Sequence, residues 1–452
     1  MAKKEIDMLH GPLAGKILLY TLPLMLSGIL QLAFNAADTI VVGRFAGGDS
    51  LAAVGSTGSL INLIINVFMG LGVGVSVSVA HAWGAGNDDA VSRIVHTAIV
   101  TAAIGGVLVF FIGFFGCHTF LSWMGTPDNV IDLSTLYMRI YFIGMPGCML
   151  YNFGASALRS IGDTRHPMLF LIISGVVNVI LNLITVIFFH LGVAGVAIAT
   201  AVSQYVSAAL VLVFLARIDN ACRLSFSKLR IDREKLAIIL RIGLPAGLQG
   251  SVFSISNVLI QSSINSFGSL AMEGNTAASN LEGFVYIVMN SFYHASLTFV
   301  GQNVGARQYR RITRILFTCL GLVSVIGLLS GWGIYLLRAP LISIYRPGQA
   351  HVLEYGAVRM SVIATTYFLC GMMETFTGTL RGMGASLSPM LISLFGACVS
   401  RVVWIYTVFA AHRTLFVLYL SYPMSWLLTI AMQIVLYAIL KRRLERRGPA
   451  PH

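Results

Sequence analysis

Residues 22–44, "LPLMLSGILQLAFNAADTIVVGR", decide the fold. The stretch is apolar over the length of a membrane crossing, and its only charged residues are Asp38 and Arg44. About 20 apolar residues in a helix span the hydrocarbon core of a bilayer. An ionised carboxylate at that depth costs about 2.5 kcal/mol or more, so such residues are rare and usually functional. The stretch therefore predicts a transmembrane helix that carries one acid with a special role.

The whole chain has the composition of a polytopic membrane protein. Of its 452 residues, 57% are hydrophobic and 10% are charged, whereas soluble domains carry about 25% charged residues. A bilayer admits helices or closed barrels, and the long apolar runs exclude the short alternating strands of a barrel. We predict an all-α integral membrane protein with twelve spans. They lie near residues 17–42, 50–80, 95–120, 135–158, 168–190, 194–216, 244–266, 275–300, 315–337, 355–379, 388–411 and 414–440.

The net charge of +13 reflects membrane topology and not nucleic-acid binding. With the N-terminus in the cytoplasm, 23 of the 30 Lys and Arg residues fall in inside segments. The other seven are Arg44, Arg139, Arg338, Arg346, Arg359, Arg401 and Arg413. This asymmetry follows the positive-inside rule and places both termini in the cytoplasm. We expect a monomer in the cell membrane, whose partners are lipid and small molecules and not nucleic acid.

The sequence contains an internal repeat. "LPLMLSG" begins at Leu22 and "LPAGLQG" begins at Leu244, and the same separation joins "ALRSIGDTRHPM" from Ala157 to "TLRGMGASLSPM" from Thr379. We call this separation, from Leu22 to Leu244, the repeat offset. Each half then holds six spans that enter the membrane in the same direction. We predict two six-helix bundles related by a pseudo-two-fold axis along the membrane normal. The predicted domains are an N-lobe (1–216), a cytoplasmic linker (217–243) and a C-lobe (244–452).

Such a duplication indicates a transporter with its substrate site near the membrane midplane, although a duplicated channel or scaffold has the same pattern. No motif supplies energy from a nucleotide. The nearest phosphate-loop pattern, "HGPLAGKI", has His10 at the first glycine position and Ile17 at the final Ser/Thr position. We therefore predict coupling to an ion gradient, with H⁺ or Na⁺ as the coupling ion and no cofactor.

Asp38 is the leading candidate for the ion-binding group. It shares one helix face with Gln31 and Asn35, because these residues are four and three positions apart. Asn178 and Asn182 of the fifth span are four apart, as are Thr200 and Gln204 of the sixth. If these faces converge, they form an oxygen-rich pocket in which Asp38 takes up a proton or serves as a ligand to Na⁺.

A different position for Asp38 is compatible with the same sequence. The residue could lie at the outer end of its helix and reach water, or it could pair with Arg44, about 9 Å further along the helix. In either case it would have no role in coupling.

The second half offers polar residues without an obvious counterpart to Asp38. The candidates for a substrate cavity are Gln31, Gln204, Asn257, Gln261, Glu282, Tyr286 and Glu374. Glu282 and Glu374 would be buried acids that serve coupling or attract a cationic substrate. The alternative for them is an interhelical hydrogen bond or a pairing with Arg401, which we place in the middle of a span.

Five segments make the chain resemble the multidrug and toxic compound extrusion (MATE) transporters. They are "LPLMLSGILQLAFNAADTIVVGRFAGGDSLAAVGS", "ALRSIGDTRHPM", "GVAGVAIATAVSQ", "FVGQNVGARQ" and "TLRGMG". They come from both halves, and the chain is most similar to the bacterial branch with an aspartate in the first helix. The resemblance implies two lobes that rock around a central cavity and export organic cations or amphipathic toxins in exchange for H⁺ or Na⁺.

The resemblance also implies roles for single residues. Asp38 matches the first-helix acid, Asn178 the fifth-helix asparagine and Thr200 a sixth-helix hydroxyl of the same pocket. Two positions depart from the family pattern: Asn182 stands where an acid is often found, and Cys370 stands where another branch has an acid, one turn before Glu374.

Two other functions compete with the antiporter. A flippase for lipid-linked oligosaccharide precursors would need cations for a pyrophosphate, and Arg401 is the main mid-span candidate. An embedded enzyme lacks support, since neither H-E-x-x-H nor G-x-S-x-G occurs.

Overall fold

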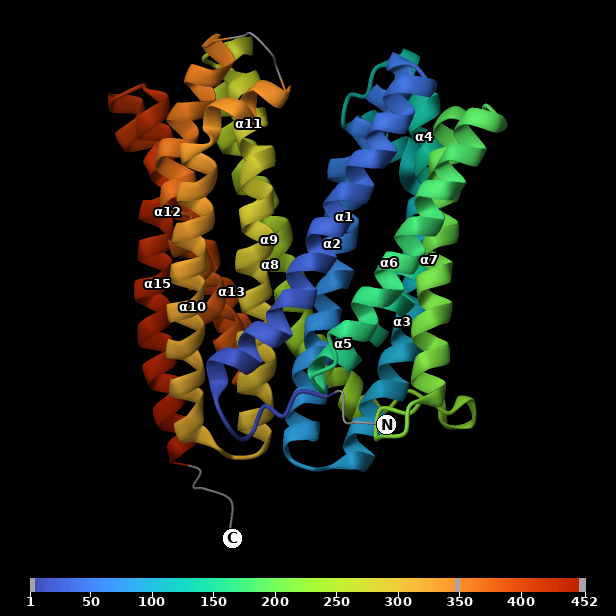
Figure 1. Ribbon diagram of the computed structural model, residues 1–452, viewed down its shortest axis with the longest axis vertical. Helices are drawn as coiled ribbons and strands as arrows, with labels where there is room; N and C mark the ends of the chain where they lie inside the picture. The colour runs from blue at the N-terminus through green and yellow to red at the C-terminus, as the bar shows by residue number, and fades with distance from the viewer. Residues whose placement is uncertain (1–4, 346–349, 447–452) are drawn as a thin grey trace. The chain divides into compact units, whose positions relative to one another are not determined.

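A computed structural model describes residues 5–345 and 350–446, which are helical apart from short connections (Figure 1). The first half contains α1 (Leu13–Phe45), α2 (Gly48–Gly84), α3 (Asp88–Trp123), α4 (Asp128–Ile143), α5 (Met145–Ser160), α6 (Arg165–Asn182), π-helix η1 (Leu183–Phe188) and α7 (Gly192–Arg217). A short 3₁₀ turn, η2 (Phe226–Lys228), lies between the halves. The second half contains α8 (Arg233–Asn265), α9 (Ser269–Gly305), α10 (Tyr309–Leu336), α11 (Arg338–Tyr345), α12 (Ala350–Gly382), α13 (Leu387–Ser393), π-helix η3 (Leu394–Val399), α14 (Ser400–Trp404), π-helix η4 (Ile405–Phe409) and α15 (Leu415–Glu445).

Each of the twelve predicted spans coincides with a helix or a run of consecutive helices. Within the described residues, ten helical segments are long and apolar enough to cross a membrane. The other two spans are α4–α5, which is interrupted at Gly144, and α9, which carries Asn275, Glu282 and Asn290 among its apolar residues. Arg346, one of the seven basic residues predicted not to face the cytoplasm, lies outside the described residues.

The chain folds into two compact units, and two of the three boundaries between them fall inside helices. Unit 1 comprises Met1–Ile6 and Leu26–Gly247, and unit 2 comprises Asp7–Met25 and Leu248–His452. Thus α1 begins in unit 2 and continues into unit 1, whereas α8 begins in unit 1 and continues into unit 2. The two change-over points, after Met25 and after Gly247, are separated by the repeat offset. This differs from the predicted domains, which divide between residues 216 and 244.

Specific contacts hold the start of α1 in unit 2. The hydroxyl of Tyr20 is 3.0 Å from that of Thr298, and the Tyr20 ring packs edge-on against Phe299. Nearer the N-terminus, the side chain of Asn303 donates to the carbonyl of Met8 at 3.1 Å. Since Tyr20 and Met8 are fully buried, these residues belong to the core of unit 2.

Glycines hold the start of α8 in unit 1. Gly70 and Gly74 of α2 lie against Gly243 and Gly247 of α8, and a Cβ at Gly70 would come within 2.1 Å of the Gly247 amide nitrogen. Small residues four apart allow two helices to approach backbone to backbone in a bilayer. Residues 233–243, predicted as part of the linker, are therefore helical and packed, and the connection shortens to residues 218–232.

We expect Gly70→Ala to destabilise the protein by about 1–3 kcal/mol, because the new methyl group meets backbone atoms that cannot rotate away. Gly55→Ala in the same helix is the matched control, since a Cβ there has no neighbour within 4 Å. Thermal unfolding of the detergent-purified variants tests this. Equal melting temperatures for the two variants would show that the close packing at Gly70 does not contribute to stability.

The repeat predicted from sequence is visible in local backbone structure. The π-helix η1 begins at Leu183 and η4 begins at Ile405, which is the matching position at the repeat offset. Gly162 and Gly384, related in the same way, both adopt a positive φ, of 97° and 89°. A Cβ at Gly162 would also come within 2.8 Å of the Ile6 backbone. The two halves therefore share backbone geometry in addition to sequence.

Candidate ion-coupling site

Asp38 lies in the part of α1 that belongs to unit 1, and its side chain is half-buried. The amide nitrogen of Asn182, at the end of α6, donates a hydrogen bond to the Asp38 carboxylate. Among the described residues, no ion pair joins Asp38 to Arg44, which is exposed. Asp38 is thus next to the fifth-span amides in the structure.

The hydrogen bonds continue from Asp38 across two helices. Asn182 also donates to the Asn178 side-chain oxygen at 3.3 Å, and Asn178 donates to the Thr200 hydroxyl of α7 at 3.4 Å. Asn182 and Asn178 are 1% and 5% exposed. Four of the five predicted coupling residues therefore form one connected polar cluster, which we call the Asp38 cluster (Asp38, Asn178, Asn182 and Thr200).

Local backbone structure positions this cluster. Asn182 is the last residue of α6, and the wider π-helix η1 begins at the next residue. The Thr185 hydroxyl in η1 bonds the Gly195 carbonyl of α7 at 3.0 Å, which ties the two helices together. On the other side, the Phe34 ring of α1 fills the space where a Cβ of Gly175 would stand. π-helical turns are frequent at functional sites.

The cluster offers oxygen atoms for an ion. The side-chain oxygen of Asn182 is buried and accepts no hydrogen bond. No group of three or more His, Cys, Asp or Glu residues within the described ranges could hold a metal ion. A cation here would therefore be bound by one carboxylate together with amide and hydroxyl oxygens.

The remaining candidates of the first half lie outside this cluster. Gln31 and Asn35 are exposed on α1, and neither side chain bonds a member of the Asp38 cluster in the described part of the chain. Gln204 of α7 packs at the α4–α5 junction, where a Cβ of Gly144 would come within 2.1 Å of its side-chain oxygen. Asn35 shares the helix face of Asp38 by spacing, but it lies one turn earlier in α1.

In the second half, Glu282 is not a free acid. It is 3% exposed and forms a bidentate salt bridge with Arg359 of α12, with Nη2–Oε2 at 2.7 Å and Nε–Oε1 at 3.2 Å. Arg359 also donates to the Asn275 side-chain oxygen at 2.7 Å. Of the two alternatives for Glu282, the interhelical hydrogen bond is therefore present, and the pairing with Arg401 is wrong.

The sequence matches the MatE family over residues 23–184 and 245–407, which covers most of both halves. The chain belongs to the MatE family. It is 30% identical over 387 residues to a probable multidrug resistance protein, YoeA, of Bacillus subtilis, with 83% of each chain covered. It is 26% identical over 399 residues to an FAD transporter of Shewanella oneidensis, with 87% of each covered.

A solved structure of a MATE-family multidrug resistance transporter, in an outward-facing conformation, has the same fold. Its TM-score is 0.90 at 22% identity, and the match covers 99% of this chain and 100% of that one. The prediction of a twelve-span, two-bundle membrane fold is thereby confirmed. The chain is a multi-pass membrane transporter and not an enzyme, and these relatives do not favour a flippase for lipid-linked oligosaccharides.

Among the other C-lobe candidates of this MatE protein, Gln261 is connected to the Glu282–Arg359 pair through Asn275. Gln261 accepts from Asn275 at 3.1 Å and donates to Asn265 at 2.9 Å. Asn257 and Tyr286 are exposed. Glu374 is half-buried, and in the described ranges no hydrogen bond or ion pair engages its carboxylate. Of the two predicted acids, Glu374 alone keeps an unpaired carboxylate.

Sequence reasoning missed Arg359. The predicted span begins at residue 355 and places Arg359 near its start, whereas α12 begins at Ala350 and buries Arg359 to 8% exposure. The sequence does indicate a paired arginine here, because an arginine inside an apolar span requires a partner in the membrane. The Arg359 guanidinium also lies 5.6 Å from the ring centre of Tyr419 and 5.7 Å from that of Tyr422.

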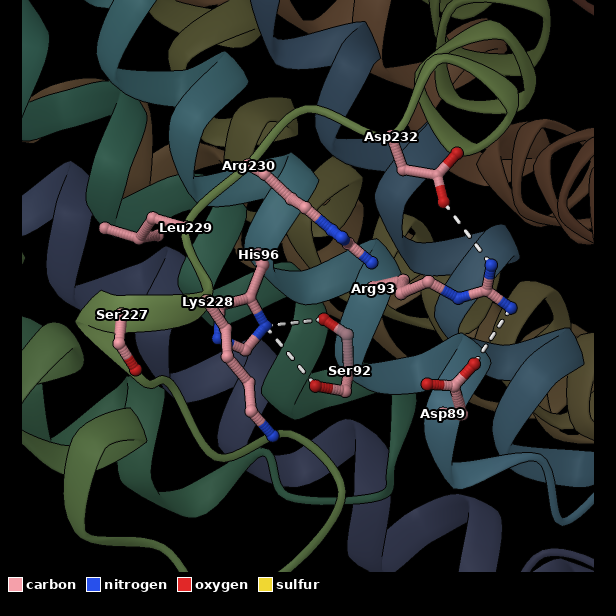
Figure 2. Close-up of a pocket in the computed structure, with 9 residues that line it drawn as sticks. All are labelled: Asp89, Ser92, Arg93, His96, Ser227, Lys228, Leu229, Arg230 and Asp232. Atoms are coloured by element: carbon pink, nitrogen blue, oxygen red, sulfur yellow. Dashed lines mark hydrogen bonds and ion pairs between the residues drawn. The ribbon is translucent and has the colours of Figure 1, made fainter.

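A polar cavity of about 370 Å³, lined by none of these candidates, lies where the connection 218–232 meets α3 (Figure 2). Arg93 of α3 bonds Asp89 at 2.9 Å and reaches Asp232 at 3.6 Å. The buried His96 ring lies 2.7 Å from the Ser92 carbonyl and accepts the Ser225 amide at 3.0 Å. These contacts fasten the connection to α3, so we assign this cavity a structural role.

Proposed function

We propose that this MatE protein is an antiporter that exports organic cations or amphipathic toxins in exchange for H⁺ or Na⁺. It works by alternating access, as a monomer in the cell membrane with both termini in the cytoplasm. Ion binding at Asp38 favours one arrangement of the two lobes, and substrate favours the other, each by its difference in affinity for the two states.

The Asp38 cluster supports this proposal. A carboxylate in a membrane-spanning helix, joined by a hydrogen bond to a buried asparagine, is an arrangement that can gain and lose a charge. Its neighbours Asn178 and Thr200 are neutral, so protonation or cation binding removes the cluster's single formal charge. That change in charge is what a gradient can act on.

The donor arrangement favours the proton as the coupling ion. Asn182 directs its amide nitrogen, and not its oxygen, toward the Asp38 carboxylate. A Na⁺ site needs converging oxygen ligands, so Asn182 would have to turn its amide over. A single carboxylate with neutral donors is sufficient to bind a proton.

Vesicles containing the purified protein and loaded with a cationic dye test the proposal. We expect dye efflux under a pH gradient alone and little efflux under a Na⁺ gradient alone. The reverse result would identify Na⁺ as the coupling ion. Efflux driven by neither gradient, with folded protein in the vesicles, would contradict the antiporter.

A further inference from the structure

The repeat allows the Asp38 cluster to be carried onto the C-lobe. At the repeat offset, Asn178 corresponds to Ser400 and Thr200 to Tyr422. The π-helix that follows Asn182 corresponds to η4, which follows Trp404. Position 38 corresponds to Ile260, so the C-lobe has no acid at the matching place. Next to the counterpart of Asn178, however, the C-lobe carries a guanidinium group.

That group is Arg401, which directly follows Ser400 in α14. Its side chain is 3% exposed, its Nε donates to the Ser425 hydroxyl at 3.0 Å, and its guanidinium lies 4.3 Å from the ring centre of Tyr422. The short helix α14 stands between two π-helices, η3 and η4. Thr200 belongs to a cluster with an acid in the N-lobe. Its counterpart in the C-lobe, Tyr422, contacts a cation.

The balance of charges separates Arg401 from its neighbour Arg359. Arg359 lies near the same Tyr422 ring and is neutralised by Glu282. In the described part of the chain, no carboxylate pairs with Arg401. The two arginines and one glutamate around Tyr422 therefore leave one positive charge uncompensated. A guanidinium stays protonated in proteins, and a buried charge without a counter-ion is unfavourable.

We propose that Arg401 binds the carboxylate of an amphipathic substrate, so that the exported compounds include carboxylate-bearing ones. One excess positive charge matches a monoanion, and the planar guanidinium can hold a carboxylate through two parallel hydrogen bonds. The adjacent Tyr422 ring suits the aromatic part of such a compound. This inference deepens the proposed function and rests on it for transport, but binding can be measured separately.

A matched pair of dyes tests the proposal: a rhodamine with a free benzoate, and the methyl ester of the same rhodamine. For purified wild-type protein, fluorescence anisotropy gives the affinity for each dye, and vesicle efflux gives the transport of each. We expect Arg401→Gln to weaken binding of the benzoate dye about tenfold or more, as loss of a charged hydrogen bond does, with the ester unchanged. Arg413→Gln, at an exposed position of the same lobe, is the control and should affect neither dye.

The outcomes separate this inference from the antiporter itself. Selective loss of benzoate-dye binding in Arg401→Gln supports it, even in vesicles that show no ion-driven efflux. Equal affinities of wild type and Arg401→Gln for the benzoate dye overturn it, as does an equal loss for both dyes in folded protein. If Arg401→Gln does not fold, Arg401→Lys keeps the charge but loses the planar fork. It should then show a smaller loss, still confined to the benzoate dye.

Discussion

Asp38→Asn is expected to abolish ion-driven efflux while the protein still folds. Asparagine has nearly the same shape as aspartate, and its side-chain oxygen can still accept the amide hydrogen of Asn182. It cannot bind a proton or supply a charge to Na⁺. An ion shifts the equilibrium between the two lobe arrangements only if it binds one of them more tightly than the other. Asparagine binds the ion in neither arrangement, so we expect efflux under the coupling gradient to be at least about a hundredfold lower.

Vesicle efflux of a cationic dye measures this, with Asn35→Ala as the control. Asn35 lies on the same helix face one turn earlier, but it is exposed and its side chain is outside the Asp38 cluster. Asn35→Ala should therefore transport normally. Dye binding to purified Asp38→Asn, which needs no gradient, shows whether the variant is folded. Undiminished gradient-driven efflux in Asp38→Asn would remove Asp38 from the mechanism.

Asn178 and Asn182 could be predicted as a pair because helical periodicity alone places residues four apart on one face, whereas Thr200 lies on another helix. The sequence does not say which helices meet, so convergence on Asp38 depended on the family resemblance. Asn35 shows the limit of periodicity. It has the right spacing, yet α1 directs only Asp38 into the contact with Asn182.

Features that depend on packing between distant segments could not be predicted. Gly70 contacts Gly247, the residue of α8 at which unit 1 ends. This contact cannot be inferred from the hydrophobicity of either segment. The pairing of Glu282 with Arg359 was missed for a related reason. The predicted span 355–379 already contains Arg359, but the sequence does not show that α9 brings Glu282 against it.

Glu282→Gln is expected to destabilise the protein by about 3–5 kcal/mol, the usual effect of removing one partner from a buried ion pair. The Arg359 guanidinium is 8% exposed and would lose its counter-ion. Its hydrogen bond with Asn275 and its contacts with Tyr419 and Tyr422 would remain, but none of these neutralises the charge. Arg359→Met should be similarly harmful, since it leaves the Glu282 carboxylate unpaired.

The double variant Glu282→Gln/Arg359→Met should be more stable than either single variant, because no buried charge is left without a partner. Unfolding in sodium dodecyl sulfate gives the free energies for this cycle. Glu445→Gln is the control: it breaks the exposed Lys441–Glu445 pair at 3.7 Å, which should contribute less than about 1 kcal/mol. If Glu282→Gln instead leaves stability unchanged and lowers transport, Glu282 acts on substrate or ion, as the sequence suggests. The buried pair would then belong to the transport mechanism and not to the scaffold of the C-lobe.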